Sequence, residues 1–150
     1  MRIRGLVLAI SLTIVVTACG GSGEKASSIS DQSTETSAPA LAAAGVDLSK
    51  VDFYDSTADD PAEVDAVDNT FDHQYTEIKA GTTVSFRNDG HNEHDIVPVL
   101  KDSFDGVKTE DFEPGTETKI TFDKPGDYPY YCSLHGTATK GMNGAIRVVK

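Results

Sequence analysis

Three side chains that bind soft metal ions lie close together near the C-terminus. Cys132, His135 and Met142 fall within eleven residues, in the segment 130–144. They offer a thiolate, an imidazole and a thioether, and this donor set selects copper over hard cations. One thiolate combined with a weak thioether is typical of copper centres that transfer single electrons. Such a centre needs a second imidazole, for which His94, in an apolar run upstream, is the candidate.

The cysteine and methionine content supports this interpretation. The chain has two of each, and because Met1 and Cys19 lie in an N-terminal targeting segment, the folded part keeps only Cys132 and Met142. A lone cysteine cannot form an intramolecular disulfide, and an unpaired thiol in an exported protein needs another explanation. The alternative is that Cys132 is an inert residue of the core.

The N-terminus has the features of an export signal. Arg2 and Arg4 precede an apolar run, residues 5–16, which is too short to cross a membrane as a stable helix. Residues 1–18 are therefore predicted to be a signal peptide. The run ends in V-T-A-C-G, which resembles a bacterial lipobox with Cys19 as the lipidated residue. Ordinary cleavage after Ala18, leaving Cys19 free, is the alternative.

Composition divides the mature chain into a tether and one domain. Residues 19–45 are rich in Gly, Ser, Thr and Ala, so we expect a flexible tether that begins at the lipidated cysteine. Residues 46–150 are predicted to form a single domain. The net charge of −11 becomes −13 once Arg2 and Arg4 are removed with the signal peptide. A chain this acidic is not expected to bind nucleic acid, whose phosphates require a basic surface.

The domain reads as short strands separated by turn residues, the signature of an all-β sandwich or barrel. The expected strands are residues 64–67, 75–79, 83–87, 94–99, 116–122, 128–132 and 145–149. His94 is thus placed on a strand, and Pro98 predicts that this strand lies at an edge or bulge. Cys132 would end one strand, His135 would lie in the following loop, and Met142 would begin the next strand.

Four motifs carry a resemblance to a known family. They are D-N-T-F at 68–71, A-G-T-T-V-S-F-R-N at 80–88, H-D at 94–95, and P-G-D-Y-P-Y-Y-C-S-L-H-G at 125–136 with G-M-N-G at 141–144. The pattern resembles the cupredoxins, the blue copper proteins of the plastocyanin and pseudoazurin kind, over residues 64–150. The resemblance implies a Greek-key β-sandwich and one copper per chain that alternates between Cu⁺ and Cu²⁺. It also implies that the four ligands are His94, Cys132, His135 and Met142.

The sequence departs from plastocyanin in three places. Leu134 occupies a position where proline is usual, and Asp95 follows the first histidine where asparagine is common. Six residues separate His135 from Met142, where four are usual. Asn88, Asp95 and Ser133 are the candidates for hydrogen bonds that orient the ligands; the alternative for each is an ordinary polar residue of a turn or strand end.

These features favour an electron carrier. We expect a monomeric, non-enzymatic protein that is extracytoplasmic, either lipid-anchored to the cell membrane or periplasmic. Its partner would be a redox protein, such as a basic cytochrome or a membrane oxidoreductase. A protein for copper storage or delivery is the alternative. Seven acids in residues 52–68 are candidates for steering a basic partner, and His73 and His91 are expected to be exposed residues that bind no metal.

Overall fold

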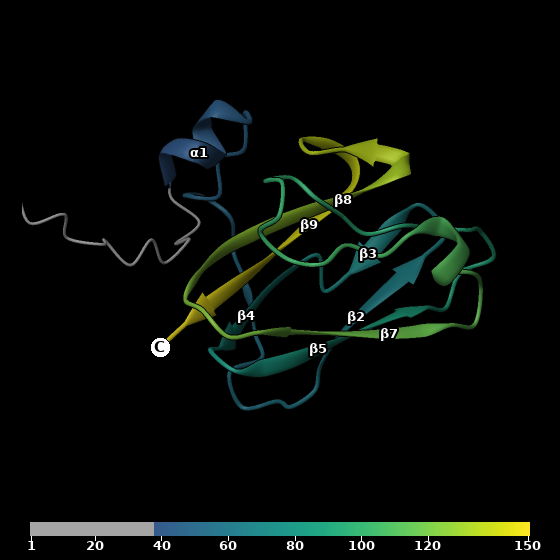
Figure 1. Cartoon of the computed structure of the whole chain (residues 1–150), viewed down its shortest axis with the longest axis horizontal. Coiled ribbons are helices and arrows are strands. Elements are labelled where there is room, and N and C mark those ends of the chain that lie inside the picture. Colours follow the sequence, from purple (N-terminus) through teal and green to yellow (C-terminus); the bar gives the residue numbers. More distant parts are fainter. Residues whose placement is uncertain (1–37) are drawn as a thin grey trace, which may run out of the picture. The chain divides into compact units, whose positions relative to one another are not determined.

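The computed structural model describes residues 38–150, which form one short α-helix, one 3-10 turn and nine strands (Figure 1). In chain order these elements are α1 (Ala38–Ala43), β1 (Tyr54–Asp55), β2 (Ala62–Val67), β3 (Thr70–Asp72), β4 (Tyr75–Lys79), β5 (Thr82–Asn88), β6 (Val97–Pro98), η1 (Thr109–Asp111), β7 (Glu117–Phe122), β8 (Gly126–Thr137) and β9 (Lys140–Val149).

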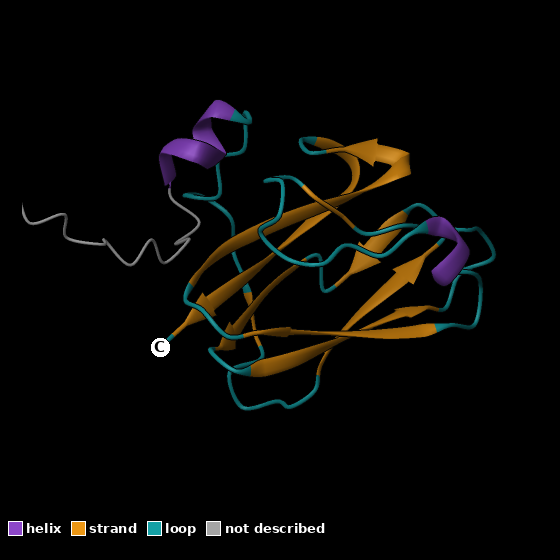
Figure 2. Cartoon of the chain, viewed as in Figure 1, coloured by secondary structure: helices purple, strands orange, loops and turns teal. Residues whose placement is uncertain are grey.

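The strands form two sheets that pack face to face (Figure 2). One sheet has the order β1-β4-β9-β8-β6 and the other the order β3-β2-β5-β7. The β4–β9 and β2–β5 pairs are parallel, whereas β8–β9 and β5–β7 are antiparallel. The predicted all-β sandwich is therefore confirmed.

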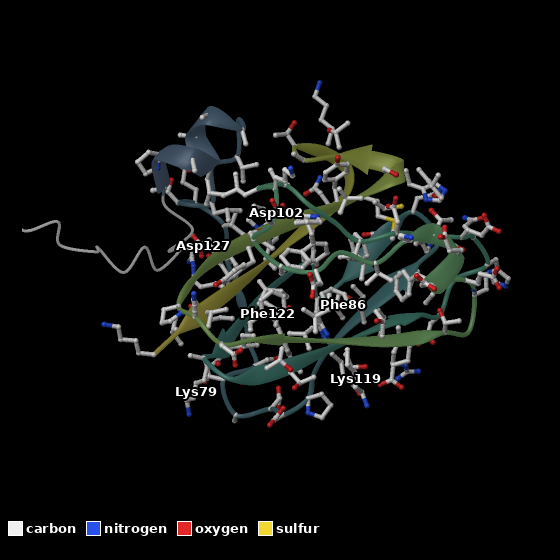
Figure 3. The ribbon with its side chains drawn as sticks, viewed as in Figure 1. Lys79, Phe86, Asp102, Lys119, Phe122 and Asp127 are labelled. Carbon is white, nitrogen blue, oxygen red and sulfur yellow. The ribbon has the colours of Figure 1, made fainter. Side chains whose placement is uncertain are left out.

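Alternating apolar residues on the inner faces of both sheets build the core. In β5, Val84 and Phe86 are fully buried, and in β9 Ile146 and Val148 are buried while Arg147 between them is partly exposed. Side chains of successive strand residues point to opposite faces, so this pattern gives each strand one inner face. Figure 3 shows Phe86 between the two sheets and Lys119 of β7 pointing away from them. The core stabilises both sheets from within.

The prediction of a strand at residues 94–99 is wrong for its first half, because residues 94–96 lie outside β6. Only Val97 and Pro98 form β6, which pairs with β8 at an edge of its sheet, as the proline predicted. His94 precedes the strand, and its backbone N–H donates to the carbonyl of Phe112 (3.4 Å). The backbone groups of this segment are satisfied by a neighbouring loop, so they need no strand partner.

The loop predicted between Cys132 and Met142 is also wrong, because strands occupy most of it. β8 continues to Thr137 and β9 begins at Lys140, so a two-residue turn closes the hairpin. We name residues 136–141 the ligand hairpin tip. Gly136 pairs with Gly141 here, and Gly141 has a φ of +73°, a conformation that glycine adopts without strain.

The ordered domain begins before the predicted end of the tether. Helix α1 falls inside residues 19–45, and its Leu41 is only 5% exposed. Composition missed this because a single large apolar residue is sufficient when a sheet offers a surface to cover. The signal peptide and Cys19 lie outside the described residues. Within residues 38–150, no helix is both long enough and apolar enough to cross a membrane.

Candidate metal centre

Three of the four predicted ligands meet at one end of the sandwich. His94 comes from the loop between β5 and β6, and Cys132 and His135 come from β8. The two Nδ1 atoms lie 3.1 Å apart, and the Cys132 Sγ lies 3.7 Å from His94 Nδ1 and 3.5 Å from His135 Nδ1. Among the described residues, this is the group of histidine, cysteine and acidic side chains placed to hold a metal ion.

The three separations fit a shared metal ion. Bonds of about 2.0–2.1 Å to nitrogen and 2.3 Å to sulfur, at roughly tetrahedral angles, separate such donor atoms by about 3.3–3.6 Å. The observed distances of 3.1, 3.5 and 3.7 Å bracket that range. A donor set of two imidazoles and one thiolate in a trigonal arrangement is the preferred environment of blue copper.

The backbone of β8 bulges to bring Cys132 and His135 together. Tyr131 pairs with Asn143, and the next pair is Gly136 with Gly141. The four residues 132–135 therefore lie opposite a single residue of β9, Met142. A bulge of this kind redirects side chains and is frequent next to functional sites. Here it turns two donors that are three residues apart toward the same point.

Met142 lies beside this bulge and inside the core. It is 1% exposed, and a β carbon at Gly136 would come within 2.5 Å of the Met142 backbone nitrogen. Only glycine therefore allows the two strands to approach so closely. The two additional residues between His135 and Met142 are taken up by the ligand hairpin tip, so the longer spacing does not carry Met142 away from the bulge.

The comparisons with known proteins agree with this geometry. Residues 58–149 match the family model described as copper binding proteins of the plastocyanin/azurin family. The chain belongs to this family. It is a cupredoxin and binds a single copper.

Three relatives illustrate the similarity. Chloroplastic plastocyanin of Physcomitrium patens is 36% identical over 78 residues, which are 47% of this chain and 45% of the relative, so the chain spans less than half of that relative's length. A reduced single-residue mutant of amicyanin has a TM-score of 0.52 at 22% identity, covering 63% of this chain and 87% of amicyanin, and it supports the fold alone. The copper-containing nitrite reductase of Thermus scotoductus is 33% identical with a TM-score of 0.49, covering 60% of this chain and 22% of the reductase.

Burial sets the protonation of the donors in the metal-free cupredoxin. Loss of solvent raises the pKa of the Cys132 thiol, although backbone N–H groups of Asp95, Leu134 and His135 oppose this by hydrogen bonding to the sulfur. Burial, and to a lesser degree the neighbouring His135, lowers the pKa of His94. A neutral imidazole is the form that ligates a metal, so His94 is held ready to bind. A metal ion bound by Cys132 would displace the thiol proton.

Asn88 fixes the loop that carries His94. Its side chain is fully buried, and Nδ2 donates to the carbonyls of Asn92 and Phe112, both at 2.9 Å. Its Oδ1 accepts the Gly90 N–H at 3.2 Å. Because the Phe112 carbonyl also accepts the His94 N–H, one amide connects the end of β5 to both segments around His94. Asn88 is thus placed to orient His94 through the backbone.

Asp95 and Ser133 connect the two ligand segments to each other. The Asp95 carboxylate accepts the Ser133 N–H at 2.6 Å and the Ser133 hydroxyl at 2.5 Å. Asp95 is only 7% exposed. Both residues follow a donor directly, so this pair of hydrogen bonds holds the His94 segment against the bulge. An asparagine would accept the Ser133 N–H through its carbonyl oxygen but would have to donate its amide to the Ser133 hydroxyl, whereas the aspartate accepts from both groups.

The remaining histidines stay apart from the centre. The His91 side chain is 94% exposed and lies 3.5 Å from Asp68 Oδ1, as expected for a loop residue. His73 is less exposed than predicted, because its ring stacks on Tyr54 with centroids 4.3 Å apart. Neither belongs to the group that could hold a metal.

The acidic segment predicted to steer a partner begins away from the centre, but its end reaches the loop that carries His94. Asp60 Oδ1 accepts the Thr83 N–H near the start of β5, whereas the His94 loop follows Asn88 at the end of that strand. At the other end of the segment, Asp68 Oδ1 lies 3.5 Å from His91, in the loop that leads to His94. Only this end of the segment therefore adjoins the loop that carries His94, and its steering role stays a prediction.

Some residues that contact the ligand strands could not be selected from local sequence. Tyr75 Oη and Gln74 Nε2 both donate to Asn143 Oδ1 at 3.3 Å, and Asn143 Nδ2 donates to the Gly141 carbonyl at 3.1 Å. Asn143 belongs to the G-M-N-G motif, but nothing in the sequence near Gln74 and Tyr75 points to the site. Only the parallel pairing of β4 with β9 brings them together.

Proposed function

We propose that this cupredoxin carries single electrons, with its copper bound by His94, Cys132, His135 and Met142. The copper supplies the chemistry by alternating between Cu⁺ and Cu²⁺. The observation that carries the proposal is the triangle of His94 Nδ1, His135 Nδ1 and Cys132 Sγ, with Met142 opposite the bulge. Two imidazoles, one thiolate and a weak thioether form the donor set of electron-transfer copper centres.

The burial of the donors supports a carrier over an enzyme. His94 and Cys132 are 0% exposed and Met142 is 1% exposed, whereas His135 is partly exposed. An enzyme would need an open coordination position that a substrate can reach. A storage or delivery protein would also need donors that a partner can approach, so this burial favours neither alternative. Electron transfer requires only a short path to the surface, which His135 provides.

The surface beside His135 supports docking of a redox partner. Leu134 precedes it and is 52% exposed, an unusual position for a large apolar side chain. Such a residue suits the apolar centre of a small interface. We propose that electrons leave through His135 while Leu134 contacts the partner. Lipid attachment at Cys19 would hold the domain at the outer side of a membrane, and this part of the proposal rests on the sequence alone.

Replacing Leu134 by asparagine should slow electron transfer to a basic cytochrome by about tenfold. Loss of roughly 1.4 kcal/mol of apolar contact in the encounter complex corresponds to a factor of ten. The second-order rate constant, measured by stopped-flow absorbance at fixed ionic strength, gives the result. Tyr54→Asn is the matched control, because Tyr54 is also 52% exposed but lies on β1 at the far edge of the sheet. Equal rates for Leu134→Asn and the wild type would contradict the proposed docking surface.

A further inference from the structure

Residues 38–53, here named the strap, lie before the region that matches the family. They cover the outer face of the five-stranded sheet. In β9, Ile146 and Val148 belong to the main core, whereas Ala145 belongs to a second apolar cluster on the opposite face. The members of this second cluster are Leu41, Val46, Leu48, Val51 and Phe53 of the strap together with Tyr75, Val99, Leu100, Ala138 and Ala145 of the sandwich.

The strap reaches the ligand hairpin tip. Ala138, one of the two turn residues, is packed against the second cluster. A β carbon placed on Gly45 would lie 3.9 Å from Cγ2 of the other turn residue, Thr139. The strap thus lies against the turn between His135 and Met142.

A second connection runs from the strap to the other side of Met142. The rings of Phe53 and Tyr75 meet edge to face, with centroids 5.9 Å apart. The Tyr75 hydroxyl donates to Asn143, and Asn143 in turn donates to the Gly141 carbonyl. Gly141 and Asn143 are the neighbours of Met142 in the chain. Phe53 is therefore linked, through Tyr75, to both residues that flank Met142.

Phe53, at the C-terminal end of the strap, is held in place by a charged side chain of the sheet. The Arg147 guanidinium lies over the Phe53 ring, 3.9 Å from its centroid. Arg147 also forms a two-bond ion pair with Asp127, at 2.7 and 3.1 Å. Bidentate pairs of this kind have a defined geometry, so they hold Phe53 in place against Tyr75.

We propose that the strap is a positioning element of the metal centre. It holds the ligand hairpin tip so that Met142 stays opposite the Cys132–His135 bulge. A two-stranded hairpin is only marginally stable by itself, and the glycines at 136 and 141 weaken this one further. The core supports the hairpin from one face and the strap supports it from the other. The inference rests on the proposed function, because it assumes that copper is bound at this bulge.

Leu41→Ser tests the proposal, since it places a hydroxyl in the second apolar cluster, to which none of the candidate donors belongs. In the metal-free protein, hydrogen exchange at the amides of residues 140–143 should accelerate by about tenfold or more relative to the wild type. In the copper-loaded protein, the visible absorption maximum and the reduction potential should both shift, because the position of a weak axial ligand tunes the centre. Leu41→Met keeps an apolar side chain of similar size. Its amide exchange rates, absorption maximum and reduction potential should therefore equal those of the wild type.

Two further variants separate positioning from general stability. Phe122→Leu removes a buried contact of the main core at the opposite end of β5, where Phe122 pairs with Thr82. It should lower stability but leave the exchange of residues 140–143, the absorption maximum and the potential as in the wild type. Tyr75→Phe keeps the ring against Phe53 and removes only the hydroxyl, so it should reproduce the effects of Leu41→Ser in smaller degree while folding normally.

The outcomes distinguish this inference from the proposed function. A wild-type protein that develops no blue colour with copper overturns the proposed function whatever the strap does. If the wild type is blue and Leu41→Ser has the same absorption maximum and potential as the wild type, the strap has no positioning role. The same conclusion follows if Leu41→Ser loses stability but otherwise behaves as Phe122→Leu does. Faster exchange and shifted copper properties in Leu41→Ser and Tyr75→Phe, but not in Phe122→Leu, support it.

Discussion

Replacing Cys132 by serine should abolish the blue colour of the copper-loaded protein. The intense absorption of such centres arises from charge transfer out of the thiolate, and a serine hydroxyl is a harder donor that stays protonated near neutral pH. Cys132 is fully buried and is the sulfur apex of the donor triangle, and residues 38–150 contain no second cysteine that could take its place. Titration with Cu²⁺, followed by visible absorbance, gives the result.

His91→Ala is the matched control for this variant. His91 is a potential copper ligand whose side chain is 94% exposed and lies outside the donor triangle. Its removal should leave the absorbance unchanged. The near isosteric Cys132→Ser change should keep the fold, which far-ultraviolet circular dichroism of the metal-free protein can verify. A blue band of normal intensity in Cys132→Ser would remove Cys132 from the centre.

Asn88→Ala should destabilise the metal-free protein by about 2–4 kcal/mol. The substitution removes the donor of the Asn92 and Phe112 carbonyls and the acceptor of the Gly90 N–H. The Phe112 carbonyl keeps only the long bond from the His94 N–H. A buried acceptor that loses its partner costs roughly 1–3 kcal/mol. The free energy of unfolding, obtained from urea titration with the slope checked for constancy, measures the effect.

Asn92→Ala serves as the control, because the Asn92 side chain is exposed and its backbone carbonyl stays in place. Its effect should stay within about 0.5 kcal/mol, as is usual for surface substitutions. Asn88→Ala should also weaken copper binding, since the loop that presents His94 loses its attachment. A free energy of unfolding equal to that of Asn92→Ala would show that Asn88 does not hold this loop.

Residue types and alternation were sufficient to predict the sandwich and to select three candidate donors that the fold brings together. β4 has the predicted bounds, and the predicted 83–87 lies within β5 because Val84 and Phe86 alternate with more polar neighbours. Cys132, His135 and His94 could be selected because few other soft or imidazole donors exist in the folded part. Local patterns of this kind survive folding whenever one face of a strand is buried.

Features that depend on contacts between distant segments could not be predicted. His94 lies in an apolar run that suggests a strand, but the carbonyl of Phe112 satisfies its backbone and only Val97 and Pro98 join the sheet. The extension of β8 and β9 beyond Cys132 and Met142 contradicts the glycine-rich local sequence, because glycine usually weakens a strand. Here β8 and β9 approach so closely that glycine is required at position 136.

The strap shows the same limitation at the N-terminus. Leu41 is isolated in a segment rich in small and polar residues, and nothing near it in sequence suggests a buried position. It becomes buried because the outer face of the sheet offers Tyr75, Ala138 and Ala145 as partners. Whether an isolated apolar residue is buried depends on the surface that the rest of the fold presents to it.

The visible absorption and electron paramagnetic resonance spectra of the wild-type protein loaded with one equivalent of Cu²⁺ test the central claim most directly. A thiolate and two imidazoles around one copper predict an intense blue absorption and a narrow copper hyperfine splitting, both of which disappear reversibly when one electron is added. A pale protein with the wide splitting of tetragonal copper would contradict this account. It would mean that His94, Cys132 and His135 do not bind copper as a set.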